Sequence, residues 1–561
     1  MWLHNFSLFL LLLLQADSTC AGRTKDQIPR RTNIIIVVDV SKPNQAITQQ
    51  HIAQVLKRTS LLRHRLSLYT TNGLKEKILK FQSRQCLINK LKSVASHHNR
   101  YSIHSVLRIA ERFDIQSFPE DEFIILLFSD KQFRLQDAQA LTQFSSYKKC
   151  QKIFVVNVGH SKNPIVGDID NTDVINTKYN AGWLRRLPFV TELPRCKEGS
   201  HVKDECGRVC ECFDGKLVNC YRVRKEFSSL TFAERERYIA TYKKVSTSRQ
   251  HKYAYEKYCH IHKHYFYKGI HNASQFFPWH RNYLLGYENL LQTVDCRVTI
   301  PVWNWAKFSS VAWNVTPSYH IWRNVGGFGG NGTYGNGYCV MNGHFQLGSW
   351  QPPLYENTRN IVSETCSQNK KCMRHCLQYI KCLRRRFTCT PPSYKLVKKN
   401  LRFSPHQFYR FDLIIRSSYH NKVHNCVGGH MQTIFASSAP EFWGHHAMLD
   451  SIWDVWQQKG EEYKWAAFTE KDAFLYGFKQ TKRSLYIDND NLAGCGIKIK
   501  YEIFDMKDLI EDENNFEEPE DFDGEEEFPS RNSAFQFDEN GAYKVSDEEF
   551  QEEKDFHDSN L

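Results

Sequence analysis

The stretch His271-Asn-Ala-Ser-Gln-Phe-Phe-Pro-Trp-His280-Arg281 decides how the central part of this 561-residue chain is organised. Pro278 suits the first turn of a helix, because its missing N–H is not needed there. His280 then starts a repeat at helical spacing, continued by Leu284, Tyr287 and Leu291. This repeat predicts a helix whose inward face carries the ring of His280.

A third histidine precedes this stretch on a helical stripe of its own. His262 continues an inward face that begins with Tyr255, Tyr258 and Cys259 at positions i, i+3 and i+4. His260 and His264 lie off that stripe and are the alternatives to His262. Three imidazoles that converge on a core suit copper or zinc, whereas ions that prefer carboxylates would meet the wrong ligands.

A second set of histidines stands about 140 residues further along. His420 and His424 are one helical turn apart, so both rings can reach one ion. His445 and His446 are adjacent, and adjacent side chains on a helix point about 100° apart, so only one can face a metal. We predict His446, because Asp450 lies four residues later and is expected to support its ring.

These stretches resemble the two copper motifs of the tyrosinase family. His271 to Glu288 is similar to the first motif, with its Phe-x-Pro-Trp-His-Arg core. His420 to His446 is similar to the second, with Gly428-Gly429 and the pair of histidines. Pro301-Val-Trp-Asn-Trp305 resembles the aromatic strand that follows the first motif. The likeness covers roughly residues 227–501.

The resemblance implies a mainly helical domain at 225–502, in which a four-helix bundle holds two copper ions. It assigns one ion to His262, His271 and His280, and the other to His420, His424 and His446. It also implies dioxygen as co-substrate, ortho-hydroxylation of monophenols, and oxidation of catechols to o-quinones. Asn421 matches a position where some tyrosinases use Asn to help activate a water. Simple backbone or solvent bonding is the alternative for this Asn.

Several positions depart from the family pattern. The interval from His262 to His271 is shorter than usual, which makes His262 the least secure of the six ligands. Asn304 and Asn342 stand where Asp is common, a change that bears on hydrogen bonding around the copper ligands. Asp412, upstream of His420, stands near a place often held by Glu.

Residues 30–190 alternate β-rich runs with helical ones, which predicts a doubly wound parallel sheet. Strands are expected at 33–39, 65–71, 122–128 and 152–158, and helices at 47–56, 86–94, 105–113 and 135–144. Asp39-Val-Ser41 and Phe128-Ser-Asp130 at strand ends resemble a von Willebrand factor A domain. Pro43 interrupts the family's cation-binding pattern, which favours a scaffold without a bound ion.

A small disulfide-rich module is expected at 194–222. It holds five cysteines but a single histidine, His201, so a zinc site is the weaker interpretation. A second group is expected to staple an insertion in the following domain: Cys366, Cys372, Cys376, Cys382 and Cys389.

The chain has the features of an exported protein. Residues 1–18 have the layout of a signal peptide, with an apolar run from Phe6 to Leu14, and no later stretch reaches the length of a membrane span. Eighteen cysteines and the glycosylation sequons at Asn314 and Asn331 fit export. The sequon at Asn272 is expected to be bare. We therefore expect a secreted protein or one stored in secretory vesicles.

Charge is distributed unevenly along the chain. The net charge is +14, yet residues 505–561 hold 22 acidic and 4 basic residues, a net of −18 that leaves +32 for the remainder. We expect residues 503–561 to form a disordered acidic tail that partly neutralises a basic body. Binding to acidic extracellular matrix is the alternative. No nucleic-acid motif accompanies the basic charge.

The leading hypothesis is a secreted dicopper phenol oxidase. Its expected substrates are phenolic small molecules, or tyrosine and DOPA residues of secreted proteins, for cross-linking or pigment formation. Two alternatives come from other classes. One is a reversible dioxygen carrier of the haemocyanin type. The other is an inactive matrix protein that acts through the A-like domain and the tail.

Overall fold

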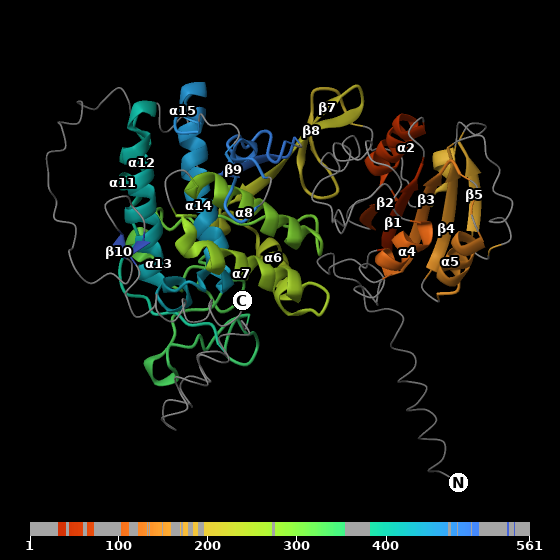
Figure 1. Cartoon of the computed structure of the whole chain (residues 1–561). Coiled ribbons are helices and arrows are strands. Elements are labelled where there is room, and N and C mark those ends of the chain that lie inside the picture. The colour runs from red at the N-terminus through yellow and green to blue at the C-terminus, as the bar shows by residue number, and fades with distance from the viewer. Residues whose placement is uncertain are drawn as a thin grey trace, which may run out of the picture.

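The computed structural model describes residues 32–188 in separate segments, 196–353 apart from 272–274, 382–503 apart from short gaps, and 536–537 with 543–544. Figure 1 shows an N-terminal sheet and a larger helical part beside it. Several predicted features lie outside the described residues: the signal peptide, the helix at 86–94, the sequon at Asn272, three of the later cysteines and nearly all of the acidic tail.

The N-terminal part is a doubly wound parallel sheet. Five strands lie in the order β2-β1-β3-β4-β5, and every pair is parallel. Alternate residues of β1 face opposite sides, so that Ile34 and Ile36 join one hydrophobic cluster with α2 and Ile35 and Val37 join another with α4 and α5. The elements are β1 (Thr32–Asp39), α2 (Gln45–Arg58), β2 (His64–Thr70), α4 (Ile103–Ala110), β3 (Phe123–Ser129), α5 (Leu135–Ser145), β4 (Cys150–Asn157) and β5 (Thr172–Asn176).

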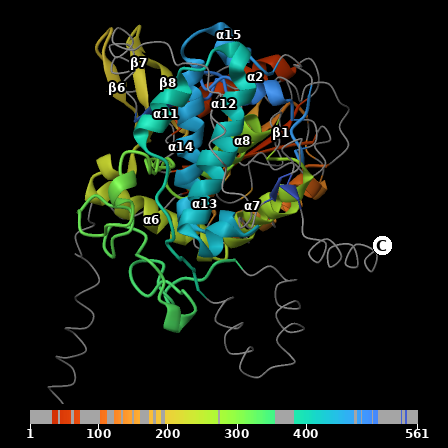
Figure 2. The ribbon, with the colours of Figure 1, turned by 90° about the vertical axis from the view of Figure 1, so that its left-hand side faces the viewer.

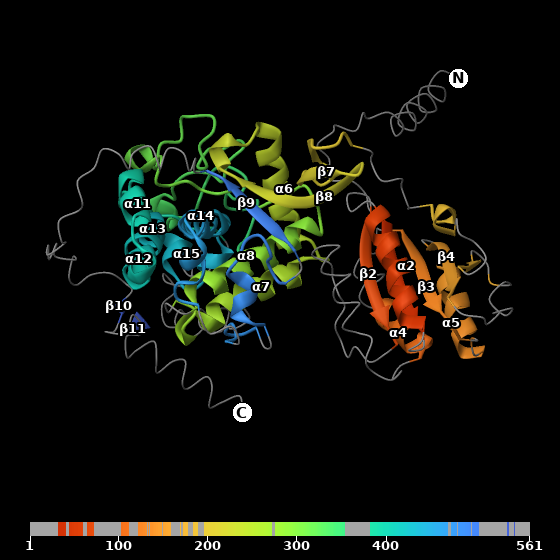
Figure 3. The same ribbon diagram turned by 90° about the horizontal axis from the view of Figure 1, so that it is seen from above.

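Figure 3 shows the strands and helices of this part from above. The described strands and helices lie within a few residues of the predicted ranges, and β5 is an additional strand. At the carboxyl edge, the Lys131 ammonium lies 2.6 Å from the carboxylate of Asp39, which also accepts a hydrogen bond from Thr71 at 2.7 Å. Lys131 thus balances the charge of this carboxylate at the edge of the sheet.

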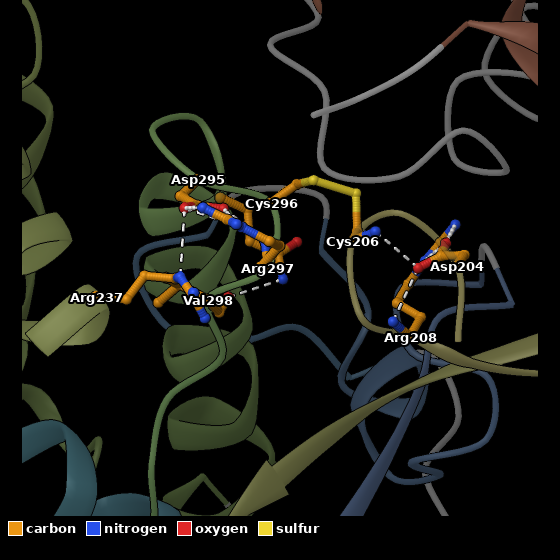
Figure 4. The surroundings of a disulfide bond; sticks show 9 residues. Asp204, Cys206, Arg208, Arg237, Asp295, Cys296, Arg297 and Val298 are labelled. Atoms are coloured by element: carbon orange, nitrogen blue, oxygen red, sulfur yellow. Dashed lines mark hydrogen bonds and ion pairs between the residues drawn. A yellow bond between two sulfur atoms is a disulfide. The ribbon is translucent and has the colours of Figure 1, made fainter. Parts of the chain in front are cut away.

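The cysteine-rich segment is joined to the helical part by a strand and a disulfide. Its sheet has the order β6-β7-β8-β9, where β9 comes from the far end of the helical part and runs parallel to β8. Cys196–Cys212 and Cys210–Cys220 close the segment internally, which confirms disulfides there. Cys206–Cys296 ties it to the loop after α8, beside the Asp295–Arg297 pair (Figure 4). The strands are β6 (His201–Lys203), β7 (Val209–Phe213), β8 (Lys216–Lys225) and β9 (Lys498–Glu502).

Removing the Cys206–Cys296 bond by a double serine substitution is expected to lower the free energy of unfolding by about 4 kcal/mol. The bond closes a loop of 90 residues, and longer closed loops restrict the unfolded chain more. Urea denaturation would measure the change. The matched control replaces Cys210 and Cys220, whose bond spans only 10 residues, and should cost about 2 kcal/mol less. An equal loss from both would contradict this account.

The helical part surrounds one long, fully buried helix. All eighteen residues of α14 are buried, and Figure 2 shows the other helices on either side of it. A capping box of Thr231 and Glu234 starts α6. The helices are α6 (Phe232–Thr247), α7 (Lys252–Tyr265), α8 (Phe276–Gln292), α11 (Tyr394–Leu401), α12 (Phe408–Ile414), the π-helix η12 (Ile415–Asn421), α13 (Lys422–Val427), α14 (Pro440–Gln457) and α15 (Glu461–Trp465).

Short elements complete the described chain. The single turns are η6 (Trp183–Arg186), η7 (Phe227–Ser229), η8 (Phe266–Lys268), η9 (Ser309–Val311), η10 (Tyr334–Asn336), η11 (Pro405–Gln407), η13 (Gly429–Gln432), η14 (Ala436–Ser438) and η15 (Arg483–Tyr486). Strands β10 (Gln536–Phe537) and β11 (Tyr543–Lys544) pair near the C-terminus. Among the described residues, no helix combines the length and the apolar character needed to cross a membrane.

A buried network of charges links β8 and β9 to the helices α8 and α14. Glu288 of α8 accepts bonds from Arg222 and Arg224 of β8, both at 2.9 Å. Arg224 also donates to the Tyr501 hydroxyl at 2.7 Å, and Tyr501 donates to Asp450 of α14. Burial alone would raise the pKa of Glu288, but Arg224 and Arg222 hold it below its ordinary value. The network therefore fixes α8 relative to α14.

Candidate metal centre

Two groups of histidines meet in the middle of the helical part. In one group, His262 of α7, His271 and His280 of α8 each bring a ring nitrogen to within 4.8 Å of the others. The second group consists of His420, His424, His445 and His446, whose ring nitrogens also lie within 4.8 Å of one another. The groups adjoin, since the rings of His280 and His446 stack with centroids 4.4 Å apart and those of His271 and His420 are 5.2 Å apart.

Hydrogen bonds to oxygen fix the orientation of three rings. The Nδ1 atoms of His280, His424 and His420 lie 2.8, 2.5 and 2.8 Å from the Phe276 carbonyl, the Met431 carbonyl and the Asn421 side-chain oxygen, respectively. Because these oxygens can only accept, each Nδ1 carries the proton and each Nε2 keeps its lone pair.

The lone pairs fit a pair of metal ions. The Nε2 atoms of His262, His271, His280, His420, His424 and His446 are buried and have no hydrogen-bond partner within the described part of the chain. A buried polar atom without a partner is costly, and bound metal would satisfy all six. Imidazole nitrogen without nearby carboxylate ligands suits copper or zinc.

Burial keeps these imidazoles neutral. It lowers the pKa of His280 to about 3 and that of His424 to about 4. Burial, with added repulsion from neighbouring histidines, also lowers the pKa of the remaining four rings well below the ordinary value. At neutral pH their lone pairs are therefore available for a metal.

The adjacent pair is distinguished by a tryptophan. Trp305 donates its indole N–H to Nδ1 of His445 at 3.1 Å. A neutral His445 must then carry its proton on Nε2, so it presents an N–H rather than a lone pair. Both nitrogens of His446 are buried with no bond to any described residue. The geometry thus favours His446 as the metal-facing member of the pair.

The predicted support of His446 by Asp450 is wrong. The Asp450 carboxylate is bound by Arg281 at 2.7 Å and by the Tyr501 hydroxyl, both in the buried network. Helical spacing indicated that Asp450 was near, but it could not reveal the arginine that competes for the carboxylate. His446 is instead packed between the rings of His280 and Phe442, at 4.4 and 4.2 Å.

Histidines 260 and 264 lie outside both groups. They are exposed and stack on each other along the outer side of α7, with centroids 5.9 Å apart. His262 is 1% exposed and its ring lies 5.5 Å from that of His271. The short interval suffices because Gly269, at φ 92°, turns the chain sharply after η8.

The residues that depart from the family pattern have other partners. The Asn304 amide donates to Glu226 at 3.3 Å, and the Asn342 side-chain oxygen accepts from the Gly330 amide at 2.7 Å. These hydrogen bonds thus join the two asparagines to Glu226 and Gly330, neither of which is a candidate metal ligand. Asp412 is fully buried and pairs with Arg416 at 2.7 Å; burial raises its pKa to about 6 although Arg416 opposes the shift.

Sequence reasoning missed three contributors to the site: Trp305, Arg416 and the Met431 carbonyl. Trp305 lies in the aromatic stretch Pro301–Trp305, but only the fold brings it to His445, which is 140 residues away. A backbone carbonyl such as that of Met431 leaves no signal in a sequence. The role of Asn421 in activating a water stays a prediction; its observed contact is with the ring of His420.

A helical domain that buries two adjoining sets of neutral imidazoles has the ligands for a paired metal centre. Residues 249–459 match the family described as the common central domain of tyrosinase. The central part of the chain is therefore a tyrosinase-family domain, of the tyrosinase-type oxidoreductase class, and this family implies a dicopper centre.

Individual relatives support the same assignment at modest identity. The tyrosinase of Streptomyces lincolnensis is 27% identical over 249 residues, which cover 42% of this chain and 83% of that protein. The tyrosinase of Streptomyces glaucescens is 28% identical over 258 residues, covering 44% and 87%. The tyrosinase-like protein phomQ2 of Diaporthe leptostromiformis is 29% identical over 209 residues, covering 34% of this chain and 46%, about half, of that relative.

Proposed function

We propose that this chain is a secreted dicopper phenol oxidase that uses dioxygen to hydroxylate monophenols at the ortho position and to oxidise catechols to o-quinones. The observation that carries the proposal is the pair of adjoining histidine sets inside a tyrosinase-family domain. Its substrates are phenolic small molecules, or tyrosine and DOPA residues of secreted proteins. The o-quinones would serve protein cross-linking or pigment formation.

Six histidines would hold the two ions. The first ion would be bound by His262, His271 and His280, and the second by His420, His424 and His446. Copper, when bound, supplies the one-electron redox chemistry that dioxygen requires. The protein fixes the rings through their Nδ1 bonds, keeps the imidazoles neutral by burial, and surrounds them with aromatic side chains that exclude water.

Export and an adhesive role for the N-terminal part belong to the same proposal. Five disulfides among the described residues favour an oxidising compartment. Asn314 and Asn331 are exposed, as glycosylated residues must be. The parallel sheet would be a von Willebrand factor A-like scaffold that contacts extracellular matrix, with Lys131 in the place of a cation.

The test is copper binding and oxygen consumption by the full chain. We expect two copper ions per chain, and oxygen uptake with both tyramine and dopamine. A His424→Ala variant is the control and should lose uptake with both. Uptake with dopamine alone would restrict the function to catechol oxidation. Reversible oxygen binding without turnover would replace the proposal with a carrier, and fewer than one copper per chain would indicate a structural protein.

A further inference from the structure

One arginine on the segment that carries the second histidine set contacts the first set. Arg416 lies in η12, one helical turn before His420, and its side chain is 8% exposed. Its Nε and Nη2 atoms bond the same Asp412 oxygen, each at 2.7 Å. Its Nη1 atom donates to the backbone carbonyl of His271 at 3.2 Å. The guanidinium therefore touches the first histidine set from the chain segment that carries the second.

His271 is the ligand candidate that most needs such a contact. His262 and His280 lie within helices, whose backbone hydrogen bonds hold them. His271 lies in the connection between η8 and α8, after the turn at Gly269, where no helical ladder fixes the backbone. Its ring bonds the backbone of Phe266 and packs against the rings of both histidine sets, while the bond from Arg416 joins its backbone to the segment that carries the second set.

We propose that Arg416 is a positioning residue that sets the place of His271 relative to the second histidine set, by holding the backbone of His271 against the helical segment of His420. The rings of these two histidines are 5.2 Å apart across the boundary between the sets. Asp412 orients the guanidinium and balances its charge inside the protein. The inference rests on the proposed function, because it assumes copper in both sets.

The contact requires the shape of arginine as well as its charge. The guanidinium donates in fixed directions, toward Asp412 on one side and His271 on the other, whereas a lysine ammonium is a single point on a flexible stem. Removing Arg416 alone would leave Asp412 buried and uncompensated, which destabilises folds. Replacing both partners by apolar residues of similar size removes the contact while avoiding that penalty.

Copper binding to the metal-free full chain tests the proposal, by equilibrium dialysis at graded free copper together with electron paramagnetic resonance. For the double variant Arg416→Met with Asp412→Leu, we expect one ion to bind as in wild type and the other about 10–100-fold more weakly, as when a partner of a ligand is lost. At copper concentrations where only the tighter ion is bound, the double variant should show the electron paramagnetic resonance spectrum of an isolated Cu(II) ion. Arg416→Lys should bind the weakened ion with an affinity between those of the wild type and the double variant. Lysine keeps the positive charge but lacks the fixed donor directions of the guanidinium.

The chain offers a matched control in Arg385 and Glu441. This pair is also fully buried and doubly bonded, at 2.8 Å each, and Arg385 also donates to backbone carbonyls, those of Phe328, Gly329 and Gly330. None of these groups belongs to a candidate ligand. The double variant Arg385→Met with Glu441→Leu should therefore bind both ions with wild-type affinity.

Two results would overturn the inference. One is wild-type affinity for both ions in the Arg416 and Asp412 variant; the other is the same selective loss of one ion in the control. If the wild-type chain itself failed to bind two ions, the proposed function would fall and this inference with it. Two ions in the wild type and unchanged binding in the variant would overturn the inference alone.

Discussion

Replacing His446 with alanine is expected to remove one of two copper ions and to lower phenol turnover by more than about a hundredfold, whereas His445→Asn should keep both ions. The reason is that Trp305 fixes the tautomer of His445 with its proton on Nε2, whereas neutral His446 keeps a lone pair that no described residue occupies. The loss at His446 should exceed the 10–100-fold effect typical of residues that only support a ligand. Copper analysis and oxygen uptake on the same preparations would measure both.

Asparagine is chosen at position 445 because its side-chain oxygen can accept from the Trp305 N–H close to where Nδ1 lies. Any effect of His445→Asn then reports on metal binding rather than on a broken indole bond. If His445→Asn lost a copper ion and His446→Ala kept both, the assignment within this pair would be reversed.

Glu288→Leu is expected to lower the free energy of unfolding by about 3–5 kcal/mol, the usual cost of removing one partner from a buried ion pair. Glu288 is fully buried and balances Arg222 and Arg224, each 2.9 Å away. Without it two guanidinium groups would remain inside the protein with too little compensating charge. Urea denaturation followed by circular dichroism would measure the change.

Glu461→Gln is the control for Glu288. Glu461 pairs with Lys464 at 2.8 Å on the surface, with its side chain 76% exposed, and such pairs contribute little in water. The control should shift the free energy of unfolding by less than about 1 kcal/mol. Equal shifts in both variants would show that the buried network does not stabilise the fold as argued.

The inward-facing histidines could be predicted from the sequence because helical periodicity is a local property. Tyr255, Cys259 and His262 share the buried side of α7, as their spacing predicted. His280, Leu284 and Tyr287 do the same in α8. Near His420 the spacing of an α-helix applies only approximately, because the segment Ile415–Asn421 is a π-helix. The alternating strands and helices of the N-terminal part were predictable for the same local reason.

The partners of those side chains could not be predicted, because they lie far away in the sequence. Spacing suggested that Asp450 supports His446, yet Arg281, 169 residues earlier, binds that carboxylate. The same limit applies to Cys206, since spacing within the cysteine-rich segment gave no sign that its partner is Cys296. The expected boundary between residues 222 and 225 falls inside β8, because this strand pairs on one side with β7 and on the other with β9 from the far end of the domain.

The parallel pairing of β8 with β9 also constrains the order of events during synthesis. Arg224 and the Tyr501 hydroxyl that it contacts are separated by 277 residues, so a nascent chain lacks this closure until Tyr501 has left the ribosome. Every histidine of the two sets has by then been translated. The buried network that fixes α8 relative to α14 therefore closes only after both histidine sets have been synthesised.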